Sequence, residues 1–156
     1  LSEFTDGYAV VKFTNMKRDG TPGSSLEFAD TDFPVFRLAD VYLMYAEAHL
    51  RGGGGDAALA LDYFNALRER AFGDDSNNVA SLTLDRIIDE RGRELYWEAH
   101  RRTDLIRFGM FTGDEYVWAW KNNVREGGAT DEKYNLFPIP ATDITANPNL
   151  TQNPGY

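Results

Sequence analysis

Cysteine is absent from the sequence, which excludes disulfide bonds, thiolate nucleophiles and cysteine-ligated metal sites. The compartment stays open, because many exported proteins also lack cysteine. The sequence contains no uninterrupted apolar run of the ~18 residues that a membrane-spanning helix needs. It begins at Leu1 without a methionine or a charged-then-apolar leader. We therefore expect a mature fragment or a piece of a longer polypeptide, with any export signal upstream.

Positive charge is also scarce, because 16 lysines and arginines stand against 25 acidic residues and the net charge is −9. Phosphate binding needs clustered basic residues, so the sequence argues against a nucleic-acid partner. What is present is typical of a soluble globular protein, with 42% hydrophobic and 26% charged residues. We expect residues 1–156 to form a single domain with a hydrophobic core.

The first third of the chain predicts a strand, a loop and a long helix. Residues 7–15 are rich in β-branched and aromatic side chains and predict a strand, which a loop follows over residues 16–25. A helix is predicted over residues 36–50, with apolar side chains around most of its circumference. Such a helix is buried on more than one side, so we expect packing partners that this chain does not contain.

A second helix is predicted over residues 57–72, with Asp56 as its N-cap. Its inner face carries Ala60, Phe64, Leu67 and Ala71, whereas Arg68, Glu69 and Arg70 are expected to face water. The short turn between these helices predicts an antiparallel pair. The pair has the size of a tetratricopeptide-like unit, although one pair alone is weak evidence for that fold.

The chain becomes less regular toward its end. A third helix is predicted from Thr83 or Asp85 to about Ala99, and a shorter helix near residues 102–108. Residues 135–156 hold four of the six prolines, so we expect no regular helix or central strand there. The apolar side chains of this tail, Leu136, Phe137, Ile139 and Leu150, are expected to pack on the helices.

Charged and apolar residues alternate closely over residues 90–109. Six charged side chains follow a partly buried seam: Arg91, Glu94, Glu98, Arg101, Asp104 and Arg107. Three of them, Glu94, Glu98 and Asp104, could act as acid and base in glycoside hydrolysis. Each carboxylate has an arginine within helical reach, however, and a nearby arginine lowers the pKa of a carboxyl group. The sequence therefore favours a structural ion-pair network over a catalytic site.

No metal or phosphate site is indicated by the sequence. His49 and His100 are the only histidines, and they lack metal-ligand spacing. Residues 74–78 carry oxygen ligands that suit Ca²⁺ without the pattern of a calcium-binding loop. The glycine run of residues 52–55 lacks the lysine that follows in phosphate-binding loops. We expect no metal and no cofactor.

Tyr116, Trp118 and Trp120 are the candidate ligand-binding residues. In an extended segment, these alternate positions point to one side. Exposed aromatic faces stack on flat ligands, and the apolar C–H faces of sugar rings suit them. The alternative is that both tryptophans cover the helices, which is the commoner location of this residue type.

Three segments resemble signature blocks of the SusD/RagB family, in the same order: "FPVFRLADVYLMYAEAHLR" (33–51), "ERGRELYWEAHRRTDLIRFG" (90–109) and "NLFPIPATDITANPNLTQNPGY" (135–156). They are C-terminal blocks of that family, so the resemblance implies the C-terminal part of a longer protein whose N-terminal half, with its lipidated cysteine, lies outside this segment. It implies a mainly α fold, in which tetratricopeptide-like antiparallel helix pairs carry long irregular loops and a proline-rich tail. The implied layout is a strand and loop over residues 1–33, a helical core over 34–109, and an irregular region over 110–156 packed on the helices.

The resemblance also implies a function. Members are outer-membrane lipoproteins of Bacteroidetes on the outer face of the cell, and they bind glycans or peptides for a SusC-like TonB-dependent transporter. They are not enzymes and need no cofactor. Their ligand contacts lie in variable loops largely outside this segment, so no binding residue carries over by resemblance. Two alternatives remain: a protein-interaction scaffold that contacts no ligand, and a glycoside hydrolase.

Overall fold

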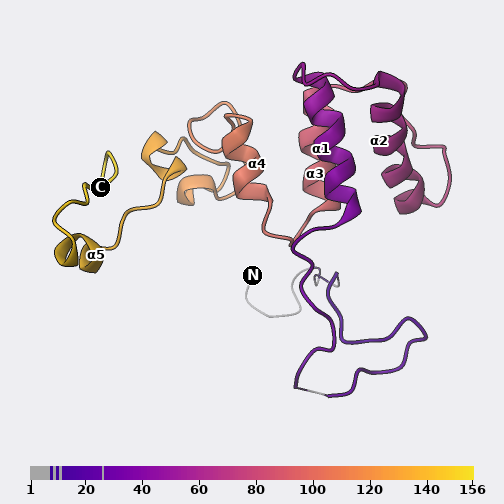
Figure 1. Cartoon of the computed structure of the whole chain (residues 1–156), viewed down its shortest axis with the longest axis horizontal. Coiled ribbons are helices and arrows are strands. Elements are labelled where there is room, and N and C mark those ends of the chain that lie inside the picture. The colour runs from indigo at the N-terminus through magenta and orange to yellow at the C-terminus, as the bar shows by residue number, and fades with distance from the viewer. Residues whose placement is uncertain (1–7, 9, 11, 26) are drawn as a thin grey trace.

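The computed structural model describes residues 8, 10, 12–25 and 27–156, and helices are its regular elements (Figure 1). The α-helices are α1 (Leu38–Leu50), α2 (Ala57–Phe72), α3 (Leu84–Glu94), α4 (Arg101–Arg107) and α5 (Ala141–Ala146). Two 3₁₀-helices, η1 (Lys121–Asn123) and η2 (Glu132–Asn135), lie between α4 and α5. No strand occurs among the residues described, so the prediction of a mainly α fold is confirmed.

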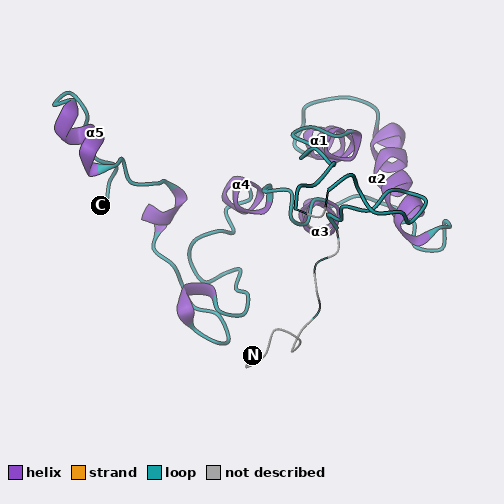
Figure 2. Ribbon diagram, turned by 90° about the horizontal axis from the view of Figure 1, so that it is seen from below, coloured by secondary structure: helices purple, strands orange, loops and turns teal. Residues whose placement is uncertain are grey.

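The core lies where α1 packs on both α2 and α3. Figure 1 shows α1 and α2 side by side in opposite directions, and Figure 2 shows α1 over α3 with α4 on the far side from α2. The antiparallel pair predicted from the sequence is therefore present. Small Ala46 and Ala60 let α1 and α2 approach closely, and Phe64 fills the space between the helices. All three side chains are buried.

Local hydrogen bonds explain where the helices begin. The Asp56 carboxylate accepts a hydrogen bond from the Leu59 amide at 2.9 Å, as predicted for the N-cap of α2. The Tyr45 hydroxyl of α1 accepts from the Asp56 amide at 2.8 Å, which ties the start of α2 to α1. Thr83 caps α3 through the Arg86 amide at 3.2 Å. These caps set the register in which the three helices pack.

Two predictions about the N-terminal segment and α2 need correction. Residues 12, 13 and 15 form bends instead of the end of a strand, and an isolated antiparallel bridge joins Met16 to Pro22. Positions 7, 9 and 11 of the predicted strand lie outside the described residues. A strand needs a neighbour for its backbone groups, and among the described residues 12–15 the Asn15 carbonyl oxygen accepts one such bond, from the Gly23 amide at 2.8 Å, which does not make a ladder. On α2, Ala71 is exposed, whereas Arg68 turns inward and pairs with Glu90 of α3 at 2.8 Å.

The end of α3 also differs from the prediction. The helix stops at Glu94, and residues 95–99 form a turn before α4. Trp97 and Ala99 adopt left-handed backbone conformations, with φ of 62° and 63°. Such conformations end a right-handed helix. Tryptophan and alanine rarely adopt them, so the sequence does not indicate that the helix ends here.

The proline-rich tail contains a short helix that the sequence did not predict. α5 occupies the interval between Pro140, its N-cap, and Pro148. Proline is compatible with a helix start because its missing amide would have no partner there, so the six residues of α5 fit into the seven-residue interval between the two prolines. The tail extends away from α1, α2 and α3 in Figure 1, and its Leu136 and Phe137 are exposed. Its packing on the helices is therefore limited to the contacts with α4 described below.

Candidate functional site

A closed loop carries the aromatic residues that the sequence singled out. Gly113 and Thr130 join its ends through two backbone hydrogen bonds of 2.8 and 3.3 Å. Within the loop, the backbone turns through left-handed conformations at Trp120, Asn122 and Asn123, which are costly for tryptophan and easier for asparagine. Gly127 is required for closure, because a Cβ atom there would lie 2.7 Å from the Trp118 carbonyl oxygen.

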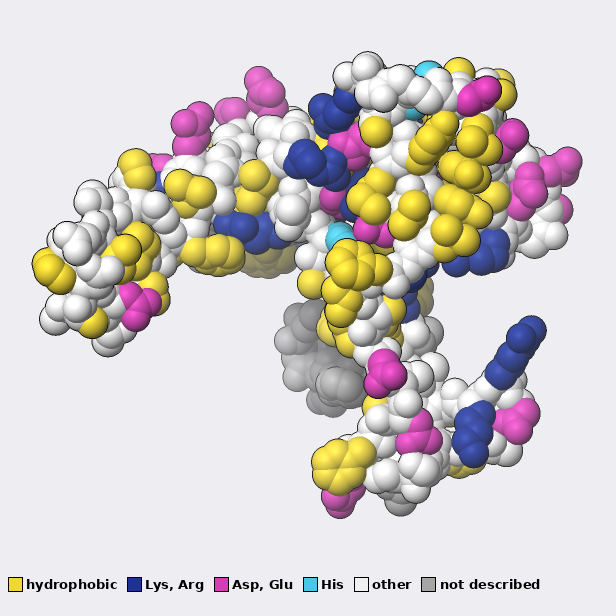
Figure 3. All heavy atoms as spheres, viewed as in Figure 1, with side chains coloured by type: hydrophobic (Ala, Val, Ile, Leu, Met, Phe, Trp, Pro, Cys, Tyr) yellow, Lys and Arg dark blue, Asp and Glu magenta, His cyan; other side chains and the backbone are white. Residues whose placement is uncertain are grey.

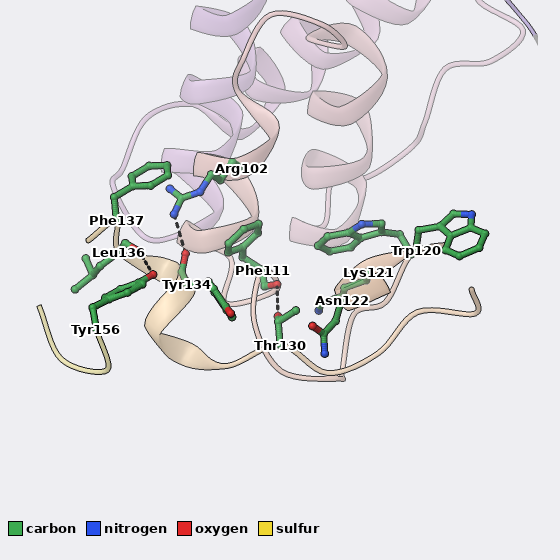
Figure 4. Close-up of a pocket in the computed structure, with 11 residues that line it drawn as sticks. Arg102, Phe111, Trp120, Lys121, Asn122, Thr130, Tyr134, Leu136, Phe137 and Tyr156 are labelled. Carbon is green, nitrogen blue, oxygen red and sulfur yellow. Dashed lines mark hydrogen bonds between the residues drawn. The ribbon is translucent and has the colours of Figure 1, made fainter. Parts of the chain in front are cut away.

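The loop, the segment that leads into it and the tail enclose a cleft of about 410 Å³ (Figure 4). This volume lies within the range of small-molecule sites, roughly 300–1,000 Å³. The cleft is mostly aromatic, with a few polar side chains among the rings. Its lining consists of Arg102, Phe111, Trp118, Trp120, Lys121, Asn122, Thr130, Tyr134, Leu136, Phe137 and Tyr156.

Arg102 of α4 holds the tail against the cleft. Its guanidinium donates to the carbonyl oxygens of Tyr134 at 2.8 Å and Asn135 at 3.3 Å. The same group lies over the ring of Phe137 at 4.1 Å and that of Phe111 at 5.0 Å, as Figure 4 shows. These contacts combine hydrogen bonding with cation–π attraction, so they position two walls of the cleft relative to α4.

The structure brings two of the three predicted aromatic residues into the cleft. Trp118 and Trp120 both line it and are 38% and 65% exposed. Tyr116 lies on the other side of Trp118, with ring centroids 6.1 Å apart, and lines a neighbouring hollow of about 350 Å³. The Tyr116 hydroxyl accepts a hydrogen bond from Arg101 at 2.7 Å. The segment is not extended through Trp120, so the three rings do not point to one side as expected.

Several lining residues escaped the sequence analysis. Arg102, Tyr134 and Tyr156 come from three separate segments, and nothing local in the sequence links them. Lys121 could have been recognised from the sequence, because it directly follows the candidate residue Trp120 in a chain with fewer basic than acidic residues. It is 2% exposed, and its ammonium donates to the Tyr116 carbonyl oxygen at 2.6 Å.

The charged residues of the 90–109 segment form ion pairs with α1. Arg91 lies between Asp40 and Asp104, at 2.8 Å from each carboxylate, and all three residues are buried. The contacting atoms are aligned away from hydrogen-bond directions, so these contacts are ionic in character. Arg107 pairs with Asp104 at 2.7 Å and also with Glu47 of α1.

A second cluster joins the start of α1 to the end of α3. The Arg37 guanidinium reaches Glu94 at 2.5 Å and Glu98 at 2.6 Å. Arg70 of α2 adds a second cation to Glu94, and Lys12 adds one to Glu98. The sequence missed the cations of this cluster because they are distant along the chain.

Arg101 departs from the predicted network. In the part of the chain that the structure describes, it forms no ion pair with a carboxylate. Its guanidinium donates instead to the Ile88 carbonyl oxygen at 2.9 Å and to Tyr116.

The electrostatics of these clusters oppose acid catalysis. Burial raises the pKa of Glu98, but hydrogen bonds from Arg37 and Lys12 outweigh burial and hold this pKa below its usual value. Burial likewise opposes the charge on Arg37 and Arg107, yet their carboxylate partners raise the pKa of both. A carboxyl group with a lowered pKa is a poor proton donor near neutral pH. The three candidate catalytic carboxylates, Glu94, Glu98 and Asp104, each contact two cations.

The histidines take part in no metal cluster within the described residues. A ring nitrogen of His49 lies 3.0 Å from the Gly54 carbonyl oxygen, and His100 precedes α4. Of the helices that the structure describes, none is both long and apolar enough to cross a lipid bilayer.

Comparison with known proteins identifies the family. A sequence profile of the SusD family matches residues 2–156. The chain is 46% identical over 156 residues to the starch-binding protein SusD of Bacteroides thetaiotaomicron, covering 100% of this chain and 27% of that protein. It is 39% identical over 162 residues to the SusD-like protein P25 of Formosa agariphila, covering 94% of this chain and 28% of that protein.

Solved structures agree with this assignment. A putative sugar binding protein from Bacteroides vulgatus matches with a TM-score of 0.66 and 34% identity, over 87% of this chain and 31% of that one. A SusD superfamily protein from Parabacteroides distasonis matches with a TM-score of 0.61 and 32% identity, over 83% and 28%. The chain thus spans roughly 27–31% of the length of these relatives. From its sequence and its fold, the chain belongs to the SusD family.

Proposed function

We propose that this chain is part of a protein that binds carbohydrate without chemically changing it. The observation that carries the proposal is 46% identity, over the whole chain, to a protein named for starch binding. The exposed indoles of Trp118 and Trp120 support it, because they offer flat apolar surfaces to sugar rings. The pairing of Glu94, Glu98 and Asp104 with cations favours binding over hydrolysis.

The wider setting is proposed from the family resemblance. The bound saccharide passes to a SusC-like TonB-dependent transporter, and the protein acts on the outer face of the outer membrane. A lipid anchor outside this segment holds it there. The remaining part of the polypeptide, which corresponds to the N-terminal portion of the relatives, completes the protein, with residues 1–156 as one structural unit.

Tryptophan fluorescence tests the proposal directly. We expect a saturable change when the chain is titrated with a panel of oligosaccharides that includes maltooligosaccharides. Trp118→Ala or Trp120→Ala should weaken binding roughly tenfold or more, which corresponds to about 1.4 kcal/mol. Trp97→Ala is the matched control, because Trp97 is also exposed but belongs to the turn after α3.

Other outcomes would point elsewhere. A flat response from a folded chain would place the saccharide site outside residues 1–156. The second candidate function, a protein-interaction scaffold, would then be favoured, and the exposed Leu38, Val41 and Met44 of α1 are the observation that supports it. Release of reducing sugar that Glu98→Gln abolishes would establish a glycoside hydrolase instead.

A further inference from the structure

The cleft has an unusual charge for this protein. Arg102 and Lys121 line it, and no aspartate or glutamate belongs to its lining. The chain as a whole carries 25 acidic residues against 16 basic ones. A cleft lined by cations alone in such an acidic chain is a local exception, and it attracts negative groups.

Of the two cations that line the cleft, Lys121 gives the stronger evidence for a negative ligand. Among the described residues, the other buried charged side chains all have an ionic partner: Asp40, Glu47, Glu90, Arg91, Glu94, Glu98 and Asp104. Lys121 is equally buried, yet no carboxylate of the described chain lies within 4.0 Å of its ammonium.

The protein satisfies this ammonium incompletely. Its Nζ atom donates to the Tyr116 carbonyl oxygen and lies 4.8 Å from the centre of the Trp118 ring. An ammonium has three donors, and one directed hydrogen bond is present here. A buried cation is costly unless an anion pairs with it. A negative group bound in the cleft would supply that pair.

We infer that the cleft takes an acidic sugar: a ring that stacks on Trp118 or Trp120 and carries a negative group that pairs with Lys121. This inference rests on the proposed carbohydrate-binding function and specifies its ligand class. Figure 4 shows Lys121 next to Asn122, whose side-chain amide donates to the Ala129 carbonyl oxygen and leaves its oxygen for ligand hydroxyls. A carboxylate and a sulfate ester present the same chemistry to Lys121, so the experiment includes both.

The test compares an acid with its neutral ester. Trigalacturonate, its methyl ester and a sulfated trisaccharide are titrated into the chain by isothermal calorimetry. We expect the acid to bind at least about tenfold more tightly than the ester, which corresponds to about 1.4 kcal/mol, and salt to weaken the acid selectively. A stronger signal from the sulfated sugar would identify sulfate as the preferred group.

Variants locate the effect. Lys121→Met keeps the length of the side chain and removes the charge, so the acid and the ester should bind this variant equally. Lys121→Arg should restore the preference for the acid. Lys17→Met, in an exposed loop, is the matched control and should behave as the unmodified chain. Circular dichroism verifies that each variant is folded.

The outcomes separate this inference from the proposed function. Equal binding of acid and ester by the unmodified chain would overturn the inference, as would an acid preference that survives in folded Lys121→Met. Saturable binding of maltotriose without a preference for acids would leave carbohydrate binding intact and reject the acidic ligand. Failure of every saccharide to bind would reject a sugar site in this cleft.

Discussion

At the scale of single residues, Arg91 is the charge on which the packing of α1, α3 and α4 depends. It is 4% exposed and lies between the buried carboxylates of Asp40 and Asp104. Arg91→Met removes the cation and leaves Asp40 without its ionic partner. We expect the free energy of unfolding to fall by about 3–5 kcal/mol, because an unpaired buried charge is costly. Urea denaturation followed by circular dichroism measures the loss.

Arg93→Met is the matched control for this prediction. Arg93 lies on the same helix and pairs with Glu90 at 2.8 Å, but its side chain is 57% exposed. Glu90 is buried but keeps Arg68 as an ionic partner at 2.8 Å when Arg93 is replaced, so no buried charge is left unpaired. The exposed Arg93 contributes about 1 kcal/mol or less, and this variant should stay close to the unmodified chain. Equal losses of unfolding free energy in Arg91→Met and Arg93→Met would show that burial does not increase the contribution of the Arg91 ion pairs to stability.

The lowered pKa of Glu98 predicts how the stability of the chain changes with pH. Its pKa in the folded chain lies below the value of an unfolded chain, because Arg37 and Lys12 outweigh the effect of burial. The folded state therefore favours the ionised carboxylate, and this contribution is fully present above the unfolded pKa of about 4.3. It is lost as the pH falls through the folded pKa.

Glu98→Gln checks the sign of this effect. The variant should be less stable than the unmodified chain at pH 7, and the difference should shrink steadily below about pH 4.3. Urea denaturation at several pH values gives the two stability curves. Parallel curves down to acid pH would contradict a lowered pKa at this position.

At the scale of the elements, the turn between α3 and α4 stores backbone strain. Ala99 has φ of 63°, a conformation that costs an L-residue roughly 1–2 kcal/mol. Glycine adopts it without that cost, although it loses about 0.5–1 kcal/mol through chain entropy. Ala99→Gly should therefore stabilise the chain by about 0.5–1 kcal/mol, seen as a higher midpoint of thermal unfolding. Ala48→Gly, in the last turn of α1, should instead destabilise by up to about 1 kcal/mol, and a fall in both variants would argue against strain at Ala99.

The same turn shows why the helices were easier to predict than their ends. Asp56 and Thr83 mark the starts of α2 and α3 through local capping bonds, so the sequence identified Asp56 and narrowed the start of α3 to Thr83 or Asp85. The left-handed residues Trp97 and Ala99 carry no such mark, because glycine and asparagine are the usual residues in this conformation. The predicted end of α3 was therefore five residues too late, at Ala99 instead of Glu94.

The candidate site could be predicted only as far as residue type indicates it. The sequence singled out Trp118 and Trp120 because aromatic faces suit sugar rings, and both line the cleft, while their role in binding stays a prediction. Arg102 and Lys121 were missed, since their importance comes from what surrounds them in space. The ion pairs show the same limit, because Arg37 meets its carboxylates only when α1 packs on α3.

At the scale of the whole molecule, the chain exposes more surface than a protein of its size normally does. Its accessible area is 11,555 Å², whereas a compact protein of 17.6 kDa exposes roughly 7,900 Å² by the usual scaling. Hydrophobic side chains gather over α1 and α2 in Figure 3, and Leu38, Val41 and Met44 of α1 are among the exposed ones. The excess of roughly 3,600 Å² is more than the roughly 1,000–2,500 Å² that each partner contributes to an obligate interface.

Two observations favour additional polypeptide, of the kind that the relatives contain, as the partner that covers this face, rather than a second copy of this chain. The relatives are much longer, since this chain spans 27–31% of them. A net charge of −9 on each copy opposes self-association. The sequence expectation that α1 is buried on more than one side agrees with this arrangement.

Cysteine labelling at Met44 tests this cover, because the chain has no cysteine of its own. Met44→Cys is placed in the chain alone and in a chimera in which the chain replaces the matching 27% of Bacteroides thetaiotaomicron SusD. We expect a thiol reagent to react about tenfold or more slowly in the chimera, because each 1.4 kcal/mol of docking free energy slows access tenfold. Ser76→Cys, in the polar loop after α2, should react at the same rate in both proteins.

Equal labelling of the Met44→Cys variant in the two proteins would mean that the rest of the chimera leaves α1 open, and the face would then be available to another protein. If labelling of the chain alone slows as the protein concentration rises, and sedimentation shows dimers, then a second copy of the chain covers this face. Selective protection in the chimera has a different meaning. In that case α1 is an internal helix of the complete protein, and residues 1–156 acquire their full stability only when the rest of the SusD-family polypeptide packs against it.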